Sequence, residues 1–275
     1  MIWSWAALMP HPPVILPQIG RGHERGAAHT LAGSKTLLSR IAARPGGGLT
    51  DFIVVLSPHQ PYDPGAILFN SAPELEGNLK RFGAPRLRLR LDTDLEIQAA
   101  LAAHLTAAGL PVTTAANPDL TPDHGAQVPL YLLSRVIPKL PPVVLANPIG
   151  LAPAQALALG EALASFQIPA RPRTTGALLA SGDFSHRLTP NSSAGFHPDG
   201  AVFDRELLAA LTGGTGADLA AKWSPERLAG VGECGYRSAL ALSGLARGPV
   251  EIISYEGPFG VGYCHALWRP REDAP

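Results

Sequence analysis

Short apolar runs recur along the chain and alternate with longer helical patterns. Residues 51–56 read Asp-Phe-Ile-Val-Val-Leu, a continuous β-branched run, and comparable apolar runs lie at 2–8, 142–146 and 176–181. Such runs are typical of strands that are buried on both faces of a sheet. Alternation with helices places such strands in a mainly parallel sheet, so the sequence predicts an α/β fold with helices on both faces.

Hydrophobic periodicity and chain breakers delimit the remaining elements. Residues 86–91 (Arg-Leu-Arg-Leu-Arg-Leu) alternate with period two, which predicts a half-exposed strand of the kind found at a sheet edge. Two further strands are predicted at 250–255 and 261–267, joined by a turn containing glycine and proline. Helices are predicted at 24–43, 95–108, 127–136, 153–166, 201–211 and from 233 to about 246.

Composition limits the classes of function. The chain has 275 residues, 46% of them hydrophobic, and a formal net charge of zero. One α/β domain of this length is common, so we expect a single domain over residues 1–275. Nucleic acids and anionic membranes call for a basic surface, which this chain lacks, so a small, weakly charged substrate fits better.

The cysteine count and the N-terminus bear on location. Two cysteines make no disulfide framework and suit a reducing cytoplasm. The apolar start of the chain has no basic residue before it and meets prolines after nine residues. It is therefore a poor signal peptide and too short to cross a bilayer, and we expect a cytoplasmic protein whose first strand is buried.

Four of the nine histidines fall where a parallel sheet would gather them. His11, His59 and His186 each follow a predicted strand, and His124 lies in a loop before a helix. Sites of open α/β sheets form at the carboxyl ends of the strands. Prolines beside His11 and His59 stiffen their loops. The pattern predicts one divalent metal ion held by His11 and His59.

Two histidines need a third ligand, and four side chains could supply it: Glu233, Cys234, Asp123 and Asp183. Glu233 stands at the start of a predicted helix and is our preferred ligand, although a carboxylate there is also an ordinary favourable interaction with the helix dipole. Asp183 and Asp123 are close in sequence to His186 and His124 and suit an orienting role.

Six segments of the chain together resemble the class III extradiol ring-cleavage dioxygenases, and within them the LigB-like superfamily of catalytic chains, to which the Memo proteins are more distantly similar. The segments are PHPPVILPQIG at 10–20, SPHQP at 57–61, DHGAQVPL at 123–130, SGDFSHRLTP at 181–190, GECGYR at 232–237 and SYEGPFGVGY at 254–263. The resemblance implies a three-layer α/β/α fold and a mononuclear non-haem Fe(II) centre.

The resemblance also implies roles for individual residues. His11 and His59 match the histidine ligands, and Glu233 is the best match to the carboxylate ligand. His186 matches an acid–base histidine, which Asp183 would orient, and His124 matches a histidine that positions substrate. Memo-like members carry cysteine where the dioxygenases carry glutamate, and Cys234 is adjacent to Glu233 here. We favour Glu233 because carboxylate oxygen is a hard donor suited to Fe(II), whereas thiolate favours zinc or copper.

The expected function is an Fe(II)-dependent extradiol dioxygenase that cleaves the ring of a small catecholic compound with O2. A homo-oligomer or a small partner chain is a further expectation, with no nucleic acid or membrane partner. Two alternatives stay open: a Memo-like metal-binding protein without dioxygenase activity, and a zinc-dependent hydrolase using the same three ligands.

Overall fold

The computed structural model describes residues 2–115 and 122–270. Its strands are β1 (Ile2–Met9), β2 (Phe52–Leu56), β3 (Ile67–Asn70), β4 (Glu74–Leu79), β5 (Ala84–Asp92), β6 (Val112–Ala115), β7 (Val143–Asn147), β8 (Thr175–Ser181), β9 (Glu251–Glu256) and β10 (Tyr263–Trp268).

The α-helices are α1 (Pro17–Gly20), α2 (Ala28–Ala42), α3 (Leu95–Ala107), α4 (His124–Leu133), α5 (Pro153–Ser165), α6 (Asp199–Gly213), α7 (Gly216–Lys222), α8 (Pro225–Val231) and α9 (Tyr236–Ala246). Short 3-10 helices are η1 (Pro13–Ile15), η2 (His23–Ala27), η3 (Pro45–Gly48), η4 (Lys80–Phe82) and η5 (Pro258–Gly260).

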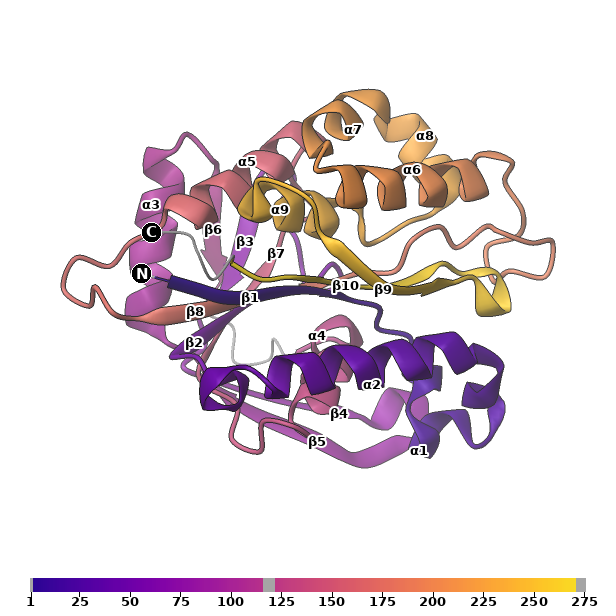
Figure 1. Cartoon of the computed structure of the whole chain (residues 1–275), viewed down its shortest axis with the longest axis horizontal. Helices are drawn as coiled ribbons and strands as arrows, with labels where there is room; N and C mark the ends of the chain where they lie inside the picture. Colours follow the sequence, from indigo (N-terminus) through magenta and orange to yellow (C-terminus); the bar gives the residue numbers. More distant parts are fainter. Residues whose placement is uncertain (1, 116–121, 271–275) are drawn as a thin grey trace.

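An eight-stranded sheet in the order β6-β3-β7-β2-β8-β1-β10-β9 forms the centre of the molecule. Its four middle strands, β7, β2, β8 and β1, are parallel to their neighbours within the group. The strands β10 and β9 complete one side as an antiparallel pair. Helices cover both faces, with α5 and α9 on one and α2 and α4 on the other (Figure 1). The predicted three-layer α/β/α fold with a mainly parallel sheet is confirmed.

Alternate residues of the central strands build two separate cores. In β2, Val54 and Leu56 pack with α3, α5 and α9 on one face of the sheet. Ile53 and Val55, between them in sequence, pack with α2 and α4 on the other face. Because successive side chains of a strand point to opposite faces, a strand between two helical layers must be apolar at every position. This requirement produces the uninterrupted run from which β2 was predicted.

The hairpin of β4 and β5 forms a second sheet beyond the main one. Every second residue of β4 is buried, and Leu75 and Leu91 join the core beneath α4. The alternating pattern at 86–91 did predict a half-exposed strand. It lies in this separate two-stranded sheet rather than at an edge of the main one, and η4 connects it to its partner (Figure 1).

The start of α9 departs from the sequence prediction. The helix was predicted from Glu233, but it begins at Tyr236 with Gly235 as its N-cap. Glu233 precedes the helix and accepts a hydrogen bond from the Tyr236 backbone N–H, one of the N–H groups that have no partner within the helix. Among the described residues no helix combines the length and the apolar character needed to cross a membrane.

Acid is expected to destabilise the fold through His265, which is fully buried in β10 between the hydroxyls of Ser34 and Ser254. Burial lowers its pKa from 6.5 to about 3. Below pH 6.5 this histidine is therefore protonated in the unfolded chain but not in the folded chain. The free energy of unfolding consequently decreases as the pH falls. Urea titrations should show that His265→Gln reduces the stability loss between pH 7 and pH 4.5 by about 2–3 kcal/mol.

The matched control is His29→Gln, which changes an exposed histidine of α2. It should leave the stability loss between the two pH values as it is in the wild type. If His265→Gln lost as much stability on acidification as the wild type, the buried imidazole would not be a source of the acid sensitivity.

Candidate metal centre

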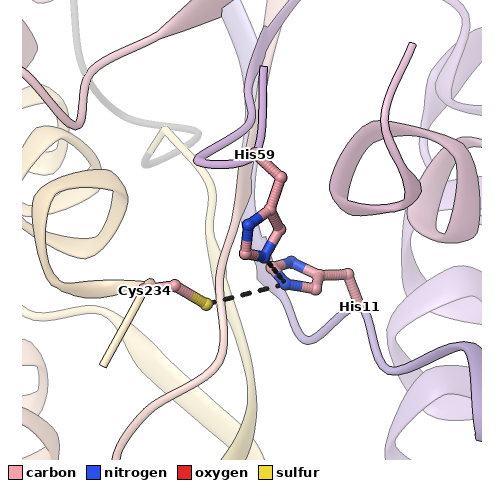
Figure 2. Close-up of side chains that lie close together, drawn as sticks. All are labelled: His11, His59 and Cys234. Carbon is pink, nitrogen blue, oxygen red and sulfur yellow. Dashed lines mark hydrogen bonds between the residues drawn. The ribbon is translucent and has the colours of Figure 1, made fainter. Parts of the chain in front are cut away.

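The carboxyl ends of β1 and β2 bring two histidines together. His11 follows β1 by two residues and His59 follows β2 by three. Their Nε2 atoms lie 3.0 Å apart, and the Cys234 sulfur lies 3.6 Å from His11 Nε2 (Figure 2). The three donor atoms are all within 4.8 Å of one another. His11 is buried, whereas His59 is exposed at the mouth of the site.

This spacing fits one metal ion. Bonds of about 2.0–2.1 Å to nitrogen and about 2.3 Å to sulfur hold neighbouring ligand atoms roughly 3.0–3.6 Å apart for angles between about 90° and 110°. The His11–His59 and His11–Cys234 distances match that range. Imidazole and thiolate are both transition-metal ligands, so the donor set as well as the spacing suits a divalent ion.

A hydrogen-bond chain fixes which nitrogen of His11 carries the proton. The Ser181 hydroxyl donates to the Gly125 carbonyl oxygen at 2.6 Å, which uses its one hydrogen. His11 Nδ1 lies 2.8 Å from the same hydroxyl oxygen and must therefore be the donor. The lone pair of the neutral ring is then on Nε2, the atom that faces His59 and Cys234. Burial, with His59 next, lowers the pKa of His11 well below its usual range and keeps the ring neutral.

Ser181 was not among the residues singled out in the sequence. It is the last residue of β8, a polar side chain that ends an apolar strand, just where His11 and His59 follow their strands. Its position at the end of a predicted strand is the sequence feature that could have identified Ser181 as a site residue.

Glu233, the preferred third ligand in the sequence analysis, does not join the two histidines. Its side chain is only 3% exposed and is turned towards α9, where it accepts from the Tyr236 N–H at 2.7 Å and pairs with Arg237 at 3.4 Å. The structure brings the neighbouring Cys234 to the histidines instead. The Glu233 carboxylate is engaged by the Tyr236 N–H and by Arg237 on the side of α9, and it is therefore directed away from the histidines.

Close packing between Gly182 and Gly235 places Cys234 near the histidines. A Cβ on Gly182 would lie 2.1 Å from the Cα of Gly235, so the loop after β8 and the loop before α9 touch through their backbones. Cys234 and Gly235 donate their N–H groups to the Asp183 carbonyl oxygen. The Asp183 N–H in turn points at the Cys234 sulfur at 3.3 Å. The thiol is consequently held in place by backbone contacts on both sides.

The Asp183 carboxylate lies close to His11 and His186. Its Oδ1 accepts the His11 backbone N–H at 2.9 Å, and its Oδ2 lies 3.9 Å from Nε2 of both His11 and His186. Burial raises its pKa to about 7. Asp183, His186 and Cys234 form a second group of donor atoms, which shares the sulfur with the first.

His186 lies beside the histidine pair with one nitrogen occupied. Its Nδ1 donates to the Gly232 carbonyl at 2.5 Å, so Nδ1 carries the proton and Nε2 presents a lone pair. Burial lowers its pKa, so the ring is neutral near pH 7. Nε2 is therefore the ring atom that can accept a proton.

His124 begins α4 and forms the outer wall of the site. Its ring stacks on His59 with a centroid separation of 4.5 Å and an angle of 17° between the rings. Burial, with His59 next, lowers its pKa to about 4. Asp123, directly before it, caps α4 and accepts hydrogen bonds from Ser57 and from the Gly125 N–H. Both residues line a pocket of about 550 Å³ that opens beside His59.

The chain is similar to known proteins over most of its length. Residues 5–265 match the catalytic LigB subunit of aromatic ring-opening dioxygenase. Protein CA_C1420 of Clostridium acetobutylicum is 29% identical over an alignment of 266 residues, which covers 93% of this chain and 55% of that protein. The chain thus spans about half the length of this curated relative.

A solved structure supports the fold. The crystal structure of the uncharacterized protein JW3007 from Escherichia coli K12 superimposes with a TM-score of 0.55 and covers 96% of this chain and 99% of that chain. At 17% sequence identity this similarity bears on the fold alone. The match over residues 5–265 takes in the histidines, Asp183 and Cys234. The chain therefore belongs to the family of the catalytic LigB subunit of aromatic ring-opening dioxygenases.

Proposed function

We propose that this protein is an Fe(II)-dependent extradiol dioxygenase that opens the ring of a small aromatic diol with O2. One observation carries the proposal: two neutral imidazoles with their Nε2 atoms 3.0 Å apart lie beside a pocket in a chain of the LigB family. His11 and His59 would hold the metal, and Cys234 is the third donor in reach.

A divalent metal bound there would act as a Lewis acid that acidifies an aromatic hydroxyl and brings the diol together with dioxygen. The residues around it handle the proton. His186 is the base, because its Nε2 is free to accept while Nδ1 is held by the Gly232 carbonyl. Asp183, 3.9 Å from that nitrogen, stabilises the imidazolium that forms and keeps the ring directed into the site.

His124 has a positioning role in this scheme. The ring is neutral, and together with His59 it forms a stacked pair at the side of the pocket. Neutral histidines do not repel a metal ion, and their faces offer a flat surface for an aromatic ring.

A second candidate function is metal binding without dioxygenase activity, as in Memo-like proteins. The observation that favours it is the position of Cys234, since thiolate suits zinc and copper better than it suits Fe(II). A zinc hydrolase would use the same donors with a bound water. Metal identity and oxygen consumption distinguish these functions.

Removal of the Ser181 hydroxyl should weaken metal binding. Ser181→Ala frees His11 Nδ1, so the ring can turn or change its tautomer, and loss of such a partner weakens metal affinity about 10–100-fold. Competition titration with a chromophoric chelator measures the change. Ser238→Ala is the matched control, because Ser238 is also buried but its hydroxyl has no hydrogen-bond partner among the described residues. Equal affinities in the two variants would show that Ser181 does not orient the ligand.

Variants at the two adjacent residues test the third donor. Cys234→Ala should lower metal affinity by about 100-fold or more, since it removes an anionic donor. Glu233→Gln should keep the metal but lose about 1 kcal/mol of stability, because a neutral amide accepts the Tyr236 N–H more weakly and forms no ion pair with Arg237. Metal content and urea titration measure both effects, and a thiolate-to-cobalt absorption band in the Co(II) protein reports the sulfur directly. Retention of metal in Cys234→Ala and absence of that band in the wild type would return the role to a carboxylate.

Oxygen uptake after anaerobic loading with Fe(II), with a panel of aromatic diols, tests the proposed activity. His186→Ala should keep its iron and lose about 10²–10⁴-fold in kcat, as expected for a general base. His23→Ala, which changes an exposed histidine of η2, is the control and should behave as the wild type. Loss of iron from His186→Ala would make that residue a ligand. Bound metal with no oxygen uptake for any diol would favour the second candidate function.

A further inference from the structure

The loop after β8 carries two polar side chains of the site. It spans residues 182–187 and presents Asp183 and His186 on either side of Phe184 and Ser185. Asp183 Oδ2 lies 3.9 Å from His186 Nε2, the ring atom that can accept a proton. Because His186 follows Ser185 directly, the direction of its ring depends on how the Ser185 backbone is held.

A carboxylate binds one of the N–H groups of this loop. The N–H groups of Phe184 and His186 donate to backbone carbonyl oxygens at 2.8 and 3.2 Å. Between them, the Ser185 N–H donates to Asp204 Oδ1 of α6 at 2.8 Å. Asp204 therefore supplies an acceptor where the neighbouring residues use the main chain, and a single substitution can remove it.

The Asp204 carboxylate is buried without a cation. It is 1% exposed, and its Oδ2 accepts a hydrogen bond from the Tyr255 hydroxyl of β9 at 2.6 Å. No basic side chain in the described part of the chain pairs with it, and burial raises its pKa to about 7. Burial of a carboxylate costs free energy that burial of an apolar side chain would not. This cost indicates a role for Asp204 beyond packing.

Gly262 connects the carboxylate to the loop. A Cβ on Gly262 would lie 2.1 Å from Asp204 Oδ2, so a larger residue would leave no room for this carboxylate. The Gly262 N–H donates to the Ser185 carbonyl at 2.9 Å. Removal of the Asp204 side chain would open a space beside Gly262. It would also leave the Ser185 N–H and the Tyr255 hydroxyl without an acceptor, and both effects free the loop to move.

We propose that Asp204 is a positioning residue, which holds the Ser185 backbone and thereby directs the His186 ring into the site. The inference deepens the proposed function, because its effect on turnover rests on the role of His186 as the base. Both hydrogen bonds to Asp204 come from neutral donors, so an acceptor of the same shape should replace it. Asparagine meets this requirement, since its Oδ1 can accept the Ser185 N–H while its Nδ2 donates to the Tyr255 oxygen.

Nuclear magnetic resonance of the isotope-labelled protein without metal tests the positioning directly. The probe is the Nδ1 proton of His186, which its hydrogen bond to the Gly232 carbonyl protects from exchange with water. The wild type and Asp204→Asn should show this signal, and Asp204→Ala should lose it. Asp204→Leu keeps the branched shape without acceptors. It should also lose the signal, and it serves as the test if the alanine variant does not fold.

The matched control is Leu211→Ala, which changes a residue buried in the same core two turns further along α6. It should lower the urea midpoint, because it leaves a cavity, and keep the His186 signal. The control separates a general loss of stability from a specific loss of the loop position.

Oxygen uptake by the Fe(II)-loaded variants tests the consequence for turnover. Asp204→Ala should lower kcat at least about tenfold, because a displaced base loses part of its contribution. Its KM and iron content should stay within about twofold of the wild type, since substrate and metal are held by other residues. In a His186→Ala background the same change should alter kcat by less than about twofold, because the residue through which Asp204 acts is absent.

Three results overturn the assignment: the His186 signal persists in Asp204→Ala and Asp204→Leu, it is lost from Asp204→Asn, or it is lost equally from Leu211→Ala. A fall in kcat of the same size with and without His186 would also overturn it. Loss of the signal from Asp204→Ala in a protein without oxygen uptake would end the dioxygenase proposal and leave the positioning role standing. Oxygen uptake with a signal that does not depend on Asp204 would do the reverse.

Discussion

Three adjacent parallel strands, β2, β8 and β1, end at one edge of the sheet, and the position of the candidate metal centre depends on their register. In that register Leu56, Ala180 and Leu8 lie side by side across the three strands. His59, Ser181 and His11 follow within a few residues of these positions. A shift of one residue in any pairing would turn alternate side chains to the opposite face of the sheet. Both apolar cores resist such a shift, so the cores that stabilise the fold also fix the spacing of the ligands.

The histidines could be predicted from sequence because their placement follows from the strands. A strand buried on both faces is an unmistakable apolar run, and the residue after it lies at the edge of the sheet. The hairpin was harder to predict. Its second strand alternates strongly at 86–91, but its first strand alternates over residues 74–79 with a glycine within it. The four-residue strands β3 and β6 are too short for periodicity to distinguish them from loops.

The choice between Glu233 and Cys234 could not be made from periodicity. The side chains of Glu233 and Cys234 point in different directions, and which of them points to the histidines depends on where α9 begins. The prediction placed Glu233 inside the helix, whereas the observed helix starts at Tyr236 and leaves Glu233 in the preceding loop, where it accepts the Tyr236 N–H. The boundary of a helix is uncertain by a few residues from sequence alone, and here three residues decide which side chain reaches the histidines.

Burial favours the protonated forms of the acidic groups in the site, and a cation would displace those protons. The pKa of Asp183 is raised to about 7, and burial raises that of the Cys234 thiol well above its usual range. The imidazoles of His11 and His186 are neutral because burial disfavours their charged forms. A bound divalent ion stabilises thiolate and carboxylate and is not repelled by neutral rings. We therefore expect metal affinity to rise as pH increases through the range in which these groups lose their protons.

Net charge does not distinguish the candidate functions. A thiolate from Cys234 and a carboxylate in its place both contribute one negative charge, so a divalent ion with two neutral histidines has the same net charge in either case. The difference lies in the softness of the donor, which favours zinc or copper with sulfur and Fe(II) with oxygen. Asp183 adds a carboxylate oxygen 3.9 Å from His11 Nε2, so both kinds of donor lie beside the same nitrogen. If the centre binds a metal as proposed, its chemistry would depend on which of these two anions is the ligand.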